Sequence, residues 1–472
     1  QNVVSATEKI KKCQDALYLT DARDDRAELV SVKGSRVQHT CEWIKENDMY
    51  KSWLCGQRNL VWISGGPGKG KTLLSIFLTE ELENAITDNS HVVYYFCSHQ
   101  DEKRNNAVQI IRGLLWQITR IAQLRDLVLQ HFSAQEKNNR TLLSSSESLW
   151  RLFAAIVTDP AMGTFYCLLD GLDECDYEST NWLVKKLGDL FSADNTGLTT
   201  VRLVIVSRDL PSIAALVTRT KCGRVNLDSD HEDQIKSDIE RVASANVKRF
   251  SWMDGYSPRF EEVHKILLER SEGTFLWVGC VVNELEKETT CSGVLQKLRT
   301  FPKSLNAIYG RMLLQIEESD RRLQTSLILR WVALAVSPLT LEELAAAIQT
   351  QPFTTIDAEP TGDQVVVIGA QQVIRDQIKM CGSLLQLHGE TVVLVHKSAR
   401  EFLLRKEADD STILEEFRIR PAEAHMLIAL TCLECIKRSP LRERALSPDN
   451  SATWQESPLL RYAVIHWQEH AK

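Results

Sequence analysis

Residues 59–77 read NLVWISGGPGKGKTLLSIF, a short apolar run that leads through a glycine-rich loop into a second apolar run. This order predicts a strand, a tight loop and a helix. Residues 65–72 match the pattern G-x-x-x-x-G-K-[ST] of phosphate-binding loops. Glycines let the backbone approach a ligand closely, so successive N–H groups can point at phosphate oxygens, and the following helix adds its N-terminal dipole. The stretch predicts a nucleotide-binding site, with a purely structural glycine turn as the alternative.

The residues of this loop have distinct expected roles. Lys71 would contact the β and γ phosphates, and the Thr72 hydroxyl would be a ligand of Mg²⁺. The predicted nucleotide-binding residues of the loop are Gly65, Gly66, Pro67, Gly68, Lys69, Gly70, Lys71 and Thr72. We therefore expect Mg²⁺ with ATP or ADP as cofactors, and the sequence leaves GTP open.

A second informative stretch is 164–176, TFYCLLDGLDECD, in which a continuous apolar run ends in four acids within seven residues. In parallel α/β sheets ligands bind at the carboxyl ends of the strands, so Asp170 is expected beside the phosphate loop, where it can hold Mg²⁺ through water. Asp173 and Glu174 follow one short turn later, close enough to orient a water that attacks the γ phosphate. The alternative is an ordinary acidic loop after a strand.

A further strand-like run, VRLVIVSR at 201–208, ends in Arg208. At the end of a buried strand this arginine could reach the γ phosphate and report its presence. Together with Lys71, Asp173 and Glu174 it forms the predicted catalytic set. A salt-bridged surface arginine is the alternative.

Length, charge and cysteine usage limit the class of protein. The chain has 472 residues, too many for one hydrophobic core, and 63 acidic against 56 basic residues give a net charge of −7. This balance offers no electrostatic case for nucleic acid or an anionic membrane as the main partner. Neither a long apolar span nor a secretory signal is visible, so we expect a cytoplasmic protein. The cysteines are expected to be reduced, and Cys432 and Cys435 to pack in a helix rather than to bind a metal.

The order of apolar patterns predicts an α/β protein with additional helical parts. Strands separated by helices indicate a parallel, doubly wound sheet sandwiched by helices. The predicted domains are a helical lead-in (1–55), a nucleotide-binding domain (56–228), a helical lid (229–300), a winged-helix-like domain (301–410) and a helical C-terminal segment (411–472). The winged-helix prediction rests on helices followed by a hairpin around 388–390.

Several local patterns give more specific expectations. Residues 21–26, DARDDR, read as a solvated loop, and residues 37–53 as a helix with an apolar face. The polar stretch 134–146 is expected to be an exposed loop. Thr340 followed three residues later by Glu343 predicts a capping box at a helix start.

These motifs resemble those of the NACHT nucleotide-binding proteins, a branch of the signal-transducing P-loop ATPases, and most of all their filamentous-fungal members. The resemblance covers nearly the whole chain and rests on LYLTDARDDR (17–26), GGPGKGKT (65–72), LLDGLDEC (168–175), IVSR (205–208), SEGTFLWV (271–278), SPLTLEEL (337–344) and LVHKSAREFLL (394–404). In the family the small residue after the first Asp, here Gly171, and the acidic pair Asp173 and Glu174 distinguish the magnesium strand.

The resemblance implies that core, lid and winged helix fold together over bound ADP, with His396 contacting the β phosphate. A histidine satisfied at a helix start is the alternative. It also implies slow NTP hydrolysis, exchange for ATP on activation and self-association, in fungal non-self recognition or regulated cell death. Family members usually carry an effector segment before the core and repeats after it. Neither is visible between Gln1 and Lys472, so we expect a piece of a longer protein whose protein partners bind through regions outside this chain.

Two other functions are compatible with the same motifs. A continuously hydrolysing ring ATPase that remodels protein substrates would need an arginine finger from a neighbour, and the sequence shows no identifiable finger. A scaffold stabilised by nucleotide would be expected to have a damaged magnesium site, whereas Asp170, Asp173 and Glu174 are intact. Nucleic-acid binding by the winged helix is not favoured, because residues 398–401, SARE, supply no basic recognition face.

Overall fold

The computed structural model describes residues 2–85, 89–101, 103–136, 143, 145–192, 200–220, 222–253, 255, 257–271, 273–316, 319–350, 370–381, 384–439, 441 and 457–472. The chain forms two compact units, Gln1–Val282 with Thr289–Leu295 and Asn283–Glu288 with Gln296–Lys472. Among the described helices, none is both long and apolar enough to cross a membrane.

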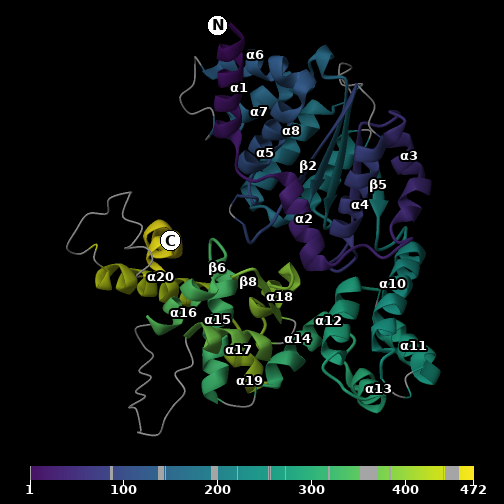
Figure 1. The fold of residues 1–472 in the computed structure, drawn as a ribbon, viewed down its shortest axis with the longest axis vertical. Coiled ribbons are helices and arrows are strands. Elements are labelled where there is room, and N and C mark those ends of the chain that lie inside the picture. Colours follow the sequence, from purple (N-terminus) through teal and green to yellow (C-terminus); the bar gives the residue numbers. More distant parts are fainter. Residues whose placement is uncertain are drawn as a thin grey trace. The chain divides into compact units, whose positions relative to one another are not determined.

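The first unit is built around a five-stranded parallel sheet (Figure 1). Its strands are β1 (Leu60–Ser64), β2 (Ser90–Phe96), β3 (Thr164–Asp170), β4 (Val201–Ser207) and β5 (Gly223–Asn226), in the order β2-β3-β4-β1-β5. Every residue of β1 and β4 is buried, as expected for apolar parallel strands covered on both faces. Ser64 pairs with Ser207, and Asp170 with Val206, so the carboxyl ends of the central strands are level. The predicted α/β sheet is confirmed.

Helices pack on the two faces of the sheet, with α5, α7 and α8 on one side and α3 and α4 on the other (Figure 1). The helices up to β5 are α1 (Asn2–Leu17), α2 (Ala22–Lys33), α3 (Asp48–Leu54), α4 (Lys71–Ala85), α5 (Ala107–Arg120), α6 (Arg125–Glu136), α7 (Ser146–Val157), α8 (Tyr177–Leu190) and α9 (Pro211–Arg219). Asn106, Ser145 and Asp176 each accept a hydrogen bond from the backbone N–H three residues on. These side chains satisfy first-turn donors and so fix where α5, α7 and α8 begin.

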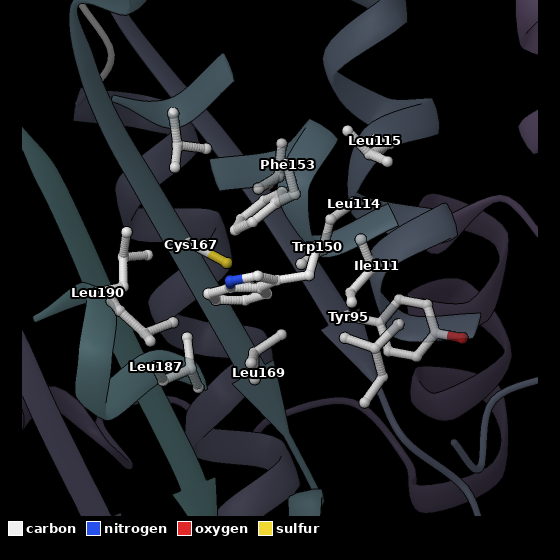
Figure 2. Close-up of a cluster of buried hydrophobic side chains, with 14 of the residues drawn as sticks. Tyr95, Ile111, Leu114, Leu115, Trp150, Phe153, Cys167, Leu169, Leu187 and Leu190 are labelled. Carbon is white, nitrogen blue, oxygen red and sulfur yellow. The ribbon is translucent and has the colours of Figure 1, made fainter. Parts of the chain in front are cut away.

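The core between the sheet and α5, α7 and α8 is aromatic at its centre (Figure 2). The ring centroids of Trp150 and Phe153 are 5.7 Å apart, and those of Phe153 and Phe165 are 6.4 Å apart. Cys167 and Leu169 of β3 point into the same cluster. Packing of these side chains holds β3 in place, and with it the acidic turn that follows the strand.

The charged stretch 21–26 forms the start of α2, and the prediction of a solvated loop is wrong. Asp21 is the N-cap of the helix, and its side chain accepts a backbone hydrogen bond. Asp25 is only 7% exposed, and its Oδ1 lies 3.4 Å from Nη1 of Arg104. The partner of this buried acid comes from a distant part of the chain, so the local sequence gave no sign of it.

The predicted helix over 37–53 is divided into two shorter elements. A 3-10 helix, η1 (Glu42–Glu46), is followed by α3, and Asn47 between them has extended backbone angles. The Asn47 side chain accepts a hydrogen bond from the N–H of Tyr50 and caps α3. Asparagine offers the backbone this alternative to a helical hydrogen bond, which explains the break.

The polar stretch 134–146 is helical at its two ends, where residues 134–136 end α6 and Ser146 begins α7. Residues 137–142 and 144 lie outside the described residues, so the exposed loop between the helices stays a prediction.

Helices follow the sheet, as predicted. They are α10 (Glu232–Val247), α11 (Phe260–Arg270), α12 (Phe275–Leu285) and α13 (Cys291–Thr300), with short 3-10 turns between α10 and α11. The limits of the lid, 229–300, stay a prediction.

The second unit is mainly helical and contains a small antiparallel sheet of order β6-β8-β7. Its elements are α14 (Leu305–Leu314), α15 (Ser319–Leu334), β6 (Leu339–Thr340), α16 (Leu341–Gln349), α17 (Ala370–Met380), β7 (Leu385–His388), β8 (Thr391–Leu394), α18 (Lys397–Leu403), α19 (Thr412–Glu416), α20 (Pro421–Arg438) and α22 (Leu460–His470). The hairpin around 388–390 and the capping box of Thr340 and Glu343 are confirmed. Cys432 and Cys435 are free thiols buried in α20.

Candidate functional site

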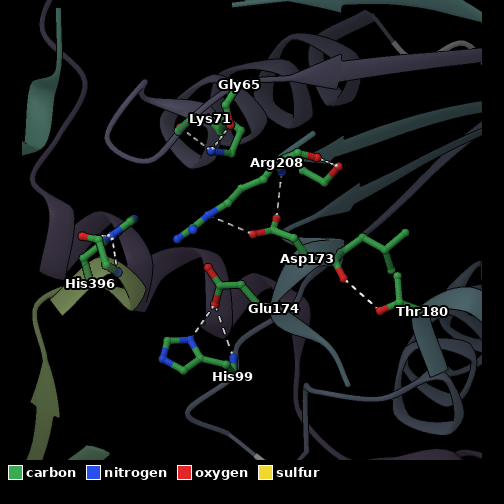
Figure 3. Close-up of polar contacts among 12 residues, drawn as sticks. Gly65, Lys71, His99, Asp173, Glu174, Thr180, Arg208 and His396 are labelled. Carbon is green, nitrogen blue, oxygen red and sulfur yellow. Dashed lines mark hydrogen bonds and ion pairs between the residues drawn. The ribbon is translucent and has the colours of Figure 1, made fainter. Parts of the chain in front are cut away.

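The phosphate loop lies between the end of β1 and the start of α4. Gly68 and Gly70 have φ values of +74° and +79°, a region that glycine adopts far more readily than other residues. Lys71 Nζ donates hydrogen bonds of 2.8 Å to the carbonyl oxygens of both Gly65 and Gly66 (Figure 3). The ammonium group thus lies against the loop that precedes it.

The start of α12 packs on the same loop. The Phe275 N–H donates to the carbonyl oxygen of Gly68 at 2.8 Å. A Cβ on Gly68 would lie 3.0 Å from Leu276 Cβ, and one on Gly70 would lie 3.0 Å from the Phe275 ring. The SEGTFLWV motif therefore packs against the phosphate loop. Gly68 and Gly70 must be glycine because a Cβ would have too little space there and because both residues have positive φ.

The surroundings of Lys71 act on its charge in opposite directions. Burial lowers the pKa of Lys71 from its usual range, and the carboxylates of Asp173 and Asp170 oppose this decrease. A phosphate group next to the ammonium would also favour the charged form. The site therefore suits an anionic ligand.

Asp170 ends β3 and is 4% exposed. Its Oδ1 accepts a hydrogen bond of 2.8 Å from the Ser75 hydroxyl, and the Thr72 side chain is also a hydrogen-bond partner of the carboxylate. Burial raises the pKa of Asp170 to about 6, while Ser75 and Thr72 lower it. The structure thus brings together Thr72 and Asp170, the two predicted metal ligands. Ser75 was not predicted, although a serine one turn after Lys71 in an apolar helix was a visible signal.

Gly171 turns the chain away from β3. It has a φ of +73°, and a Cβ at this position would lie 3.1 Å from the carbonyl oxygen of Cys97. The following residues form a 3-10 turn, η4 (Leu172–Glu174), and the Thr180 hydroxyl donates to the Leu172 carbonyl oxygen at 3.2 Å (Figure 3). The requirement for a small residue after Asp170 therefore comes from the neighbouring strand as well as from the turn itself.

Asp173 and Arg208 are paired across the ends of β3 and β4 (Figure 3). Asp173 Oδ1 accepts from the Arg208 N–H at 3.0 Å, and its Oδ2 lies 3.3 Å from Arg208 Nε. The two side chains are 6% and 22% exposed, so this is not an exposed surface ion pair. The carboxylate holds both the backbone and the side chain of the arginine.

Glu174 contacts a residue that the sequence did not indicate. Its Oε2 lies 3.3 Å from the backbone nitrogen and 3.2 Å from Nδ1 of His99 (Figure 3). His99 follows β2, and the parallel register of β2 with β3 brings this loop to the acidic turn. A histidine just after a buried strand was the available signal, but pairing of β2 with β3 cannot be read from the local sequence.

Two family models match the chain. The model described as Nephrocystin 3, N-terminal, matches residues 39–208, and the GPI inositol-deacylase winged helix domain matches residues 312–415. The vegetative incompatibility protein HET-E-1 of Podospora anserina is 28% identical over 422 residues, which are 86% of this chain and 29% of that protein. The Nephrocystin 3 model and HET-E-1 both support the resemblance to NACHT-type P-loop NTPases. This chain spans less than a third of the length of HET-E-1.

Solved structures resemble this chain only weakly. The Walker-type ATPase of Pyrococcus abyssi is 14% identical, with coverage of 82% of this chain and 99% of that chain and a TM-score of 0.36. A chain of the Drosophila ORC bound to DNA is 13% identical, with coverage of 84% and 92% and a TM-score of 0.32. Overall likenesses at this level carry no argument about function.

His396 is the N-cap of α18, within the residues that match the winged helix domain model. Its Nδ1 accepts a hydrogen bond of 3.1 Å from the Ser398 N–H and lies 2.9 Å from the Ser398 hydroxyl. That hydroxyl is 3.0 Å from the Tyr309 hydroxyl. His396 therefore caps α18 through Nδ1, and this role does not depend on the contacts of Nε2.

Proposed function

We propose that the chain is a nucleotide-dependent switch that binds ATP or ADP, or the guanine equivalents, with Mg²⁺. The diphosphate form is closed and monomeric, and exchange for the triphosphate permits self-association. One observation carries the proposal: the phosphate loop, the acidic turn and Arg208 belong to the carboxyl ends of the neighbouring strands β1, β3 and β4. This is where α/β sheets bind their ligands.

The residues present suit Mg²⁺. Thr72 and Asp170 would hold it, because a hydroxyl and a carboxylate that already contact one another offer the hard oxygen ligands this ion prefers. The described residues contain no cluster of three or more His, Cys, Asp or Glu side chains suited to a metal. Two protein oxygens agree with the usual way of binding Mg²⁺, in which phosphates and water complete the coordination. The ion would neutralise charge on the phosphates.

Slow hydrolysis would return the switch to the closed form. Glu174 is proposed to orient the attacking water, and Lys71 to stabilise the phosphates. Asp173 would hold Arg208 so that the guanidinium senses the γ phosphate. The pairs Asp173–Arg208 and Glu174–His99 support these roles, because each fixes a polar group at the edge where the γ phosphate is expected.

The name of one relative supports a biological setting: HET-E-1 is called a vegetative incompatibility protein. We propose that the switch acts in the cytoplasm, in fungal non-self recognition or regulated cell death, with protein partners bound through regions outside this chain. Shifting such a two-state system from 1:99 to 99:1 requires about 5.5 kcal/mol of differential binding, so the nucleotide must prefer one state strongly.

His396 is proposed to contact the β phosphate in the closed form, within a winged-helix domain over 301–410 that folds with the lid over the nucleotide. The variant His396→Asn separates this role from capping, because asparagine is a good N-cap residue. If the histidine contacts phosphate, His396→Asn loses ADP faster while the melting temperature without nucleotide stays the same. Equal ADP dissociation rates in both proteins would leave only the capping role.

The first experiment is to purify the chain without added nucleotide, denature it and identify what is released by chromatography. Stoichiometric ADP or GDP supports the closed switch and names the base. An empty protein that hydrolyses ATP rapidly would favour a continuously working ring ATPase, and an empty protein that binds no nucleotide would overturn the proposal.

A second experiment assigns the water-orienting residue. Glu174→Gln keeps the shape of the side chain but removes the carboxylate, so it should retain ATP and lose turnover by about 100-fold or more. Asp173→Asn is the matched comparison. Unchanged turnover in Glu174→Gln together with a loss in Asp173→Asn would transfer the role to Asp173.

A further inference from the structure

Asp228 contacts the phosphate loop, although it is not part of β1, the loop or α4. The residue follows β5, and its Oδ2 accepts a hydrogen bond of 2.8 Å from the backbone N–H of Gly66. Its Oδ1 lies 3.8 Å from Nζ of Lys69. The Asp228 N–H in turn donates to Oδ1 of Asn226 at 2.9 Å, which fixes the start of the side chain.

The geometry of one peptide unit shows what this contact does. The Gly65–Gly66 peptide is trans, so its C=O and N–H groups point in opposite directions. The Gly65 carbonyl oxygen accepts from Lys71 Nζ at 2.8 Å. The Gly66 N–H therefore points away from the ammonium group, and there it meets Asp228. Two charged side chains hold the same peptide from opposite sides.

The second contact of Asp228 concerns the other lysine of the loop. Lys69 is 16% exposed, and its Nζ lies 3.3 Å from the position of a Cβ on Gly273. An Asp228 carboxylate at 3.8 Å balances the charge of this lysine on the outer side of the loop. Lys71, by contrast, is held by the carbonyl oxygens of Gly65 and Gly66.

We propose that Asp228 is a positioning residue for nucleotide binding. Its carboxylate fixes the orientation of the Gly65–Gly66 peptide, and this peptide holds the Lys71 ammonium through its carbonyl oxygen. Asp228 itself does not touch the nucleotide and acts through the loop. The inference rests on the proposed function, because it assumes that the loop binds a nucleotide.

The test is the equilibrium dissociation constant for ADP with Mg²⁺, measured by isothermal titration calorimetry on the full chain. Asp228→Ala should weaken ADP about tenfold, the equivalent of one charge-assisted hydrogen bond. Asp228→Asn should stay within about threefold of the unchanged protein, because its amide oxygen can still accept from the Gly66 N–H. Asp230→Ala is the matched control: Asp230 is an exposed acid on the same segment, so its loss changes the net charge equally.

The outcomes separate the two proposals. If the wild-type chain binds no nucleotide, the proposed function is wrong. If the unchanged protein binds ADP and Asp228→Ala binds it as well as Asp230→Ala does, the positioning role is wrong. Tighter binding by Asp228→Ala also overturns it, since Asp228 would then compete with phosphate.

Melting temperatures without nucleotide distinguish positioning from a general loss of structure. A positioning role predicts similar melting temperatures for Asp228→Ala and Asp228→Asn but different ADP affinities. If Asp228→Ala does not fold, Asp228→Ser takes its place, because its side chain is too short to reach the loop. Equal ADP affinities of Asp228→Ser and Asp228→Asn would overturn the proposal.

Discussion

Two clusters of buried titratable groups in the described part of the chain differ in the groups that surround them. At the carboxyl end of the sheet in the first unit, Asp170 and Asp173 face hydroxyls, a lysine and an arginine. In the second unit, between α20 and α22, histidines pair with one another and with a tyrosine: His425 Nδ1 lies 2.8 Å from His470 Nδ1, and His470 Nε2 lies 2.8 Å from the Tyr462 hydroxyl.

The difference agrees with different roles. The cluster at the sheet end can bind a ligand, whereas the cluster between α20 and α22 holds two helices together. The carboxylates at the end of the sheet lie beside hydroxyls and cations that can exchange partners when phosphate arrives. Histidines buried against one another are more stable without charge, because a second positive charge beside the first would be repelled. The four predictions below test the contrast, in order of expected effect.

The largest effect is expected from Lys71→Ala. The ammonium makes two hydrogen bonds to the loop and would make further charge-assisted ones to phosphate, so its loss should weaken nucleotide binding by at least about 100-fold. Binding of ADP by calorimetry measures it. Lys186→Ala, which removes a lysine paired with Glu147 on the surface, is the control and should bind normally. Near-normal ADP binding by Lys71→Ala would show that the Lys71 ammonium does not bind the phosphates.

Gly171→Ala should destabilise the first unit by about 1–3 kcal/mol, because alanine is strained at a φ of +73° and its Cβ would lie 3.1 Å from the Cys97 carbonyl oxygen. Urea denaturation followed by circular dichroism measures this loss. Gly279→Ala is the matched control: this helical glycine has open space around its Cβ position, so the change should be neutral or stabilising. Equal stabilities of the two variants would contradict the strained turn.

The Asp173–Arg208 pair can be measured by a double-mutant cycle with Asp173→Asn and Arg208→Gln. Because the pair is largely buried, a coupling of about 1–2 kcal/mol in unfolding free energy is expected. The exposed pair Lys265 and Glu269 serves as the comparison and should give less than about 0.5 kcal/mol. A coupling no larger than that of the surface pair would mean that Arg208 is held by packing alone.

The smallest effect concerns pH and distinguishes the two clusters by sign. Burial, together with His425 and His466, lowers the pKa of His470 to about 4. Between that value and the usual 6.5 the unfolded chain binds more protons, so the contribution of His470 to stability is complete above pH 6.5 and is lost as pH falls towards 4. For Asp170, with its pKa raised to about 6, the sign is opposite: its contribution is lost as pH rises from about 4 to 6.

The melting temperature at pH 7.5 and at about pH 5.7 measures the contribution of the histidine. His470→Gln should reduce the destabilisation at the lower pH by about 1 kcal/mol, because the variant has no proton to take up. His264→Gln, which replaces a half-buried histidine on α11 of the first unit, is the matched control. The same pH dependence in both variants would exclude His470 as its source.

The parts of the site that are consecutive in the chain could be predicted from the sequence alone. The phosphate loop, the strand that ends in Asp170 and the glycine after it are recognisable locally, because apolar runs and positive-φ glycines set the backbone there. Contacts from Cys97 and α12 add a limit of space at these glycines. The capping box of Thr340 and Glu343 is likewise recognisable from the local sequence.

Which distant groups these residues meet depends on the tertiary structure. The partners in the pairs Asp173–Arg208, Glu174–His99 and Gly66–Asp228 follow different strands, and the order β2-β3-β4-β1-β5 brings them together. The error at 21–26 has the same origin, whereas the break within 37–53 is local and lies at the Asn47 cap. A charged stretch looks solvated until its distant partner is known, since burial of a charge depends on a partner that local sequence does not name.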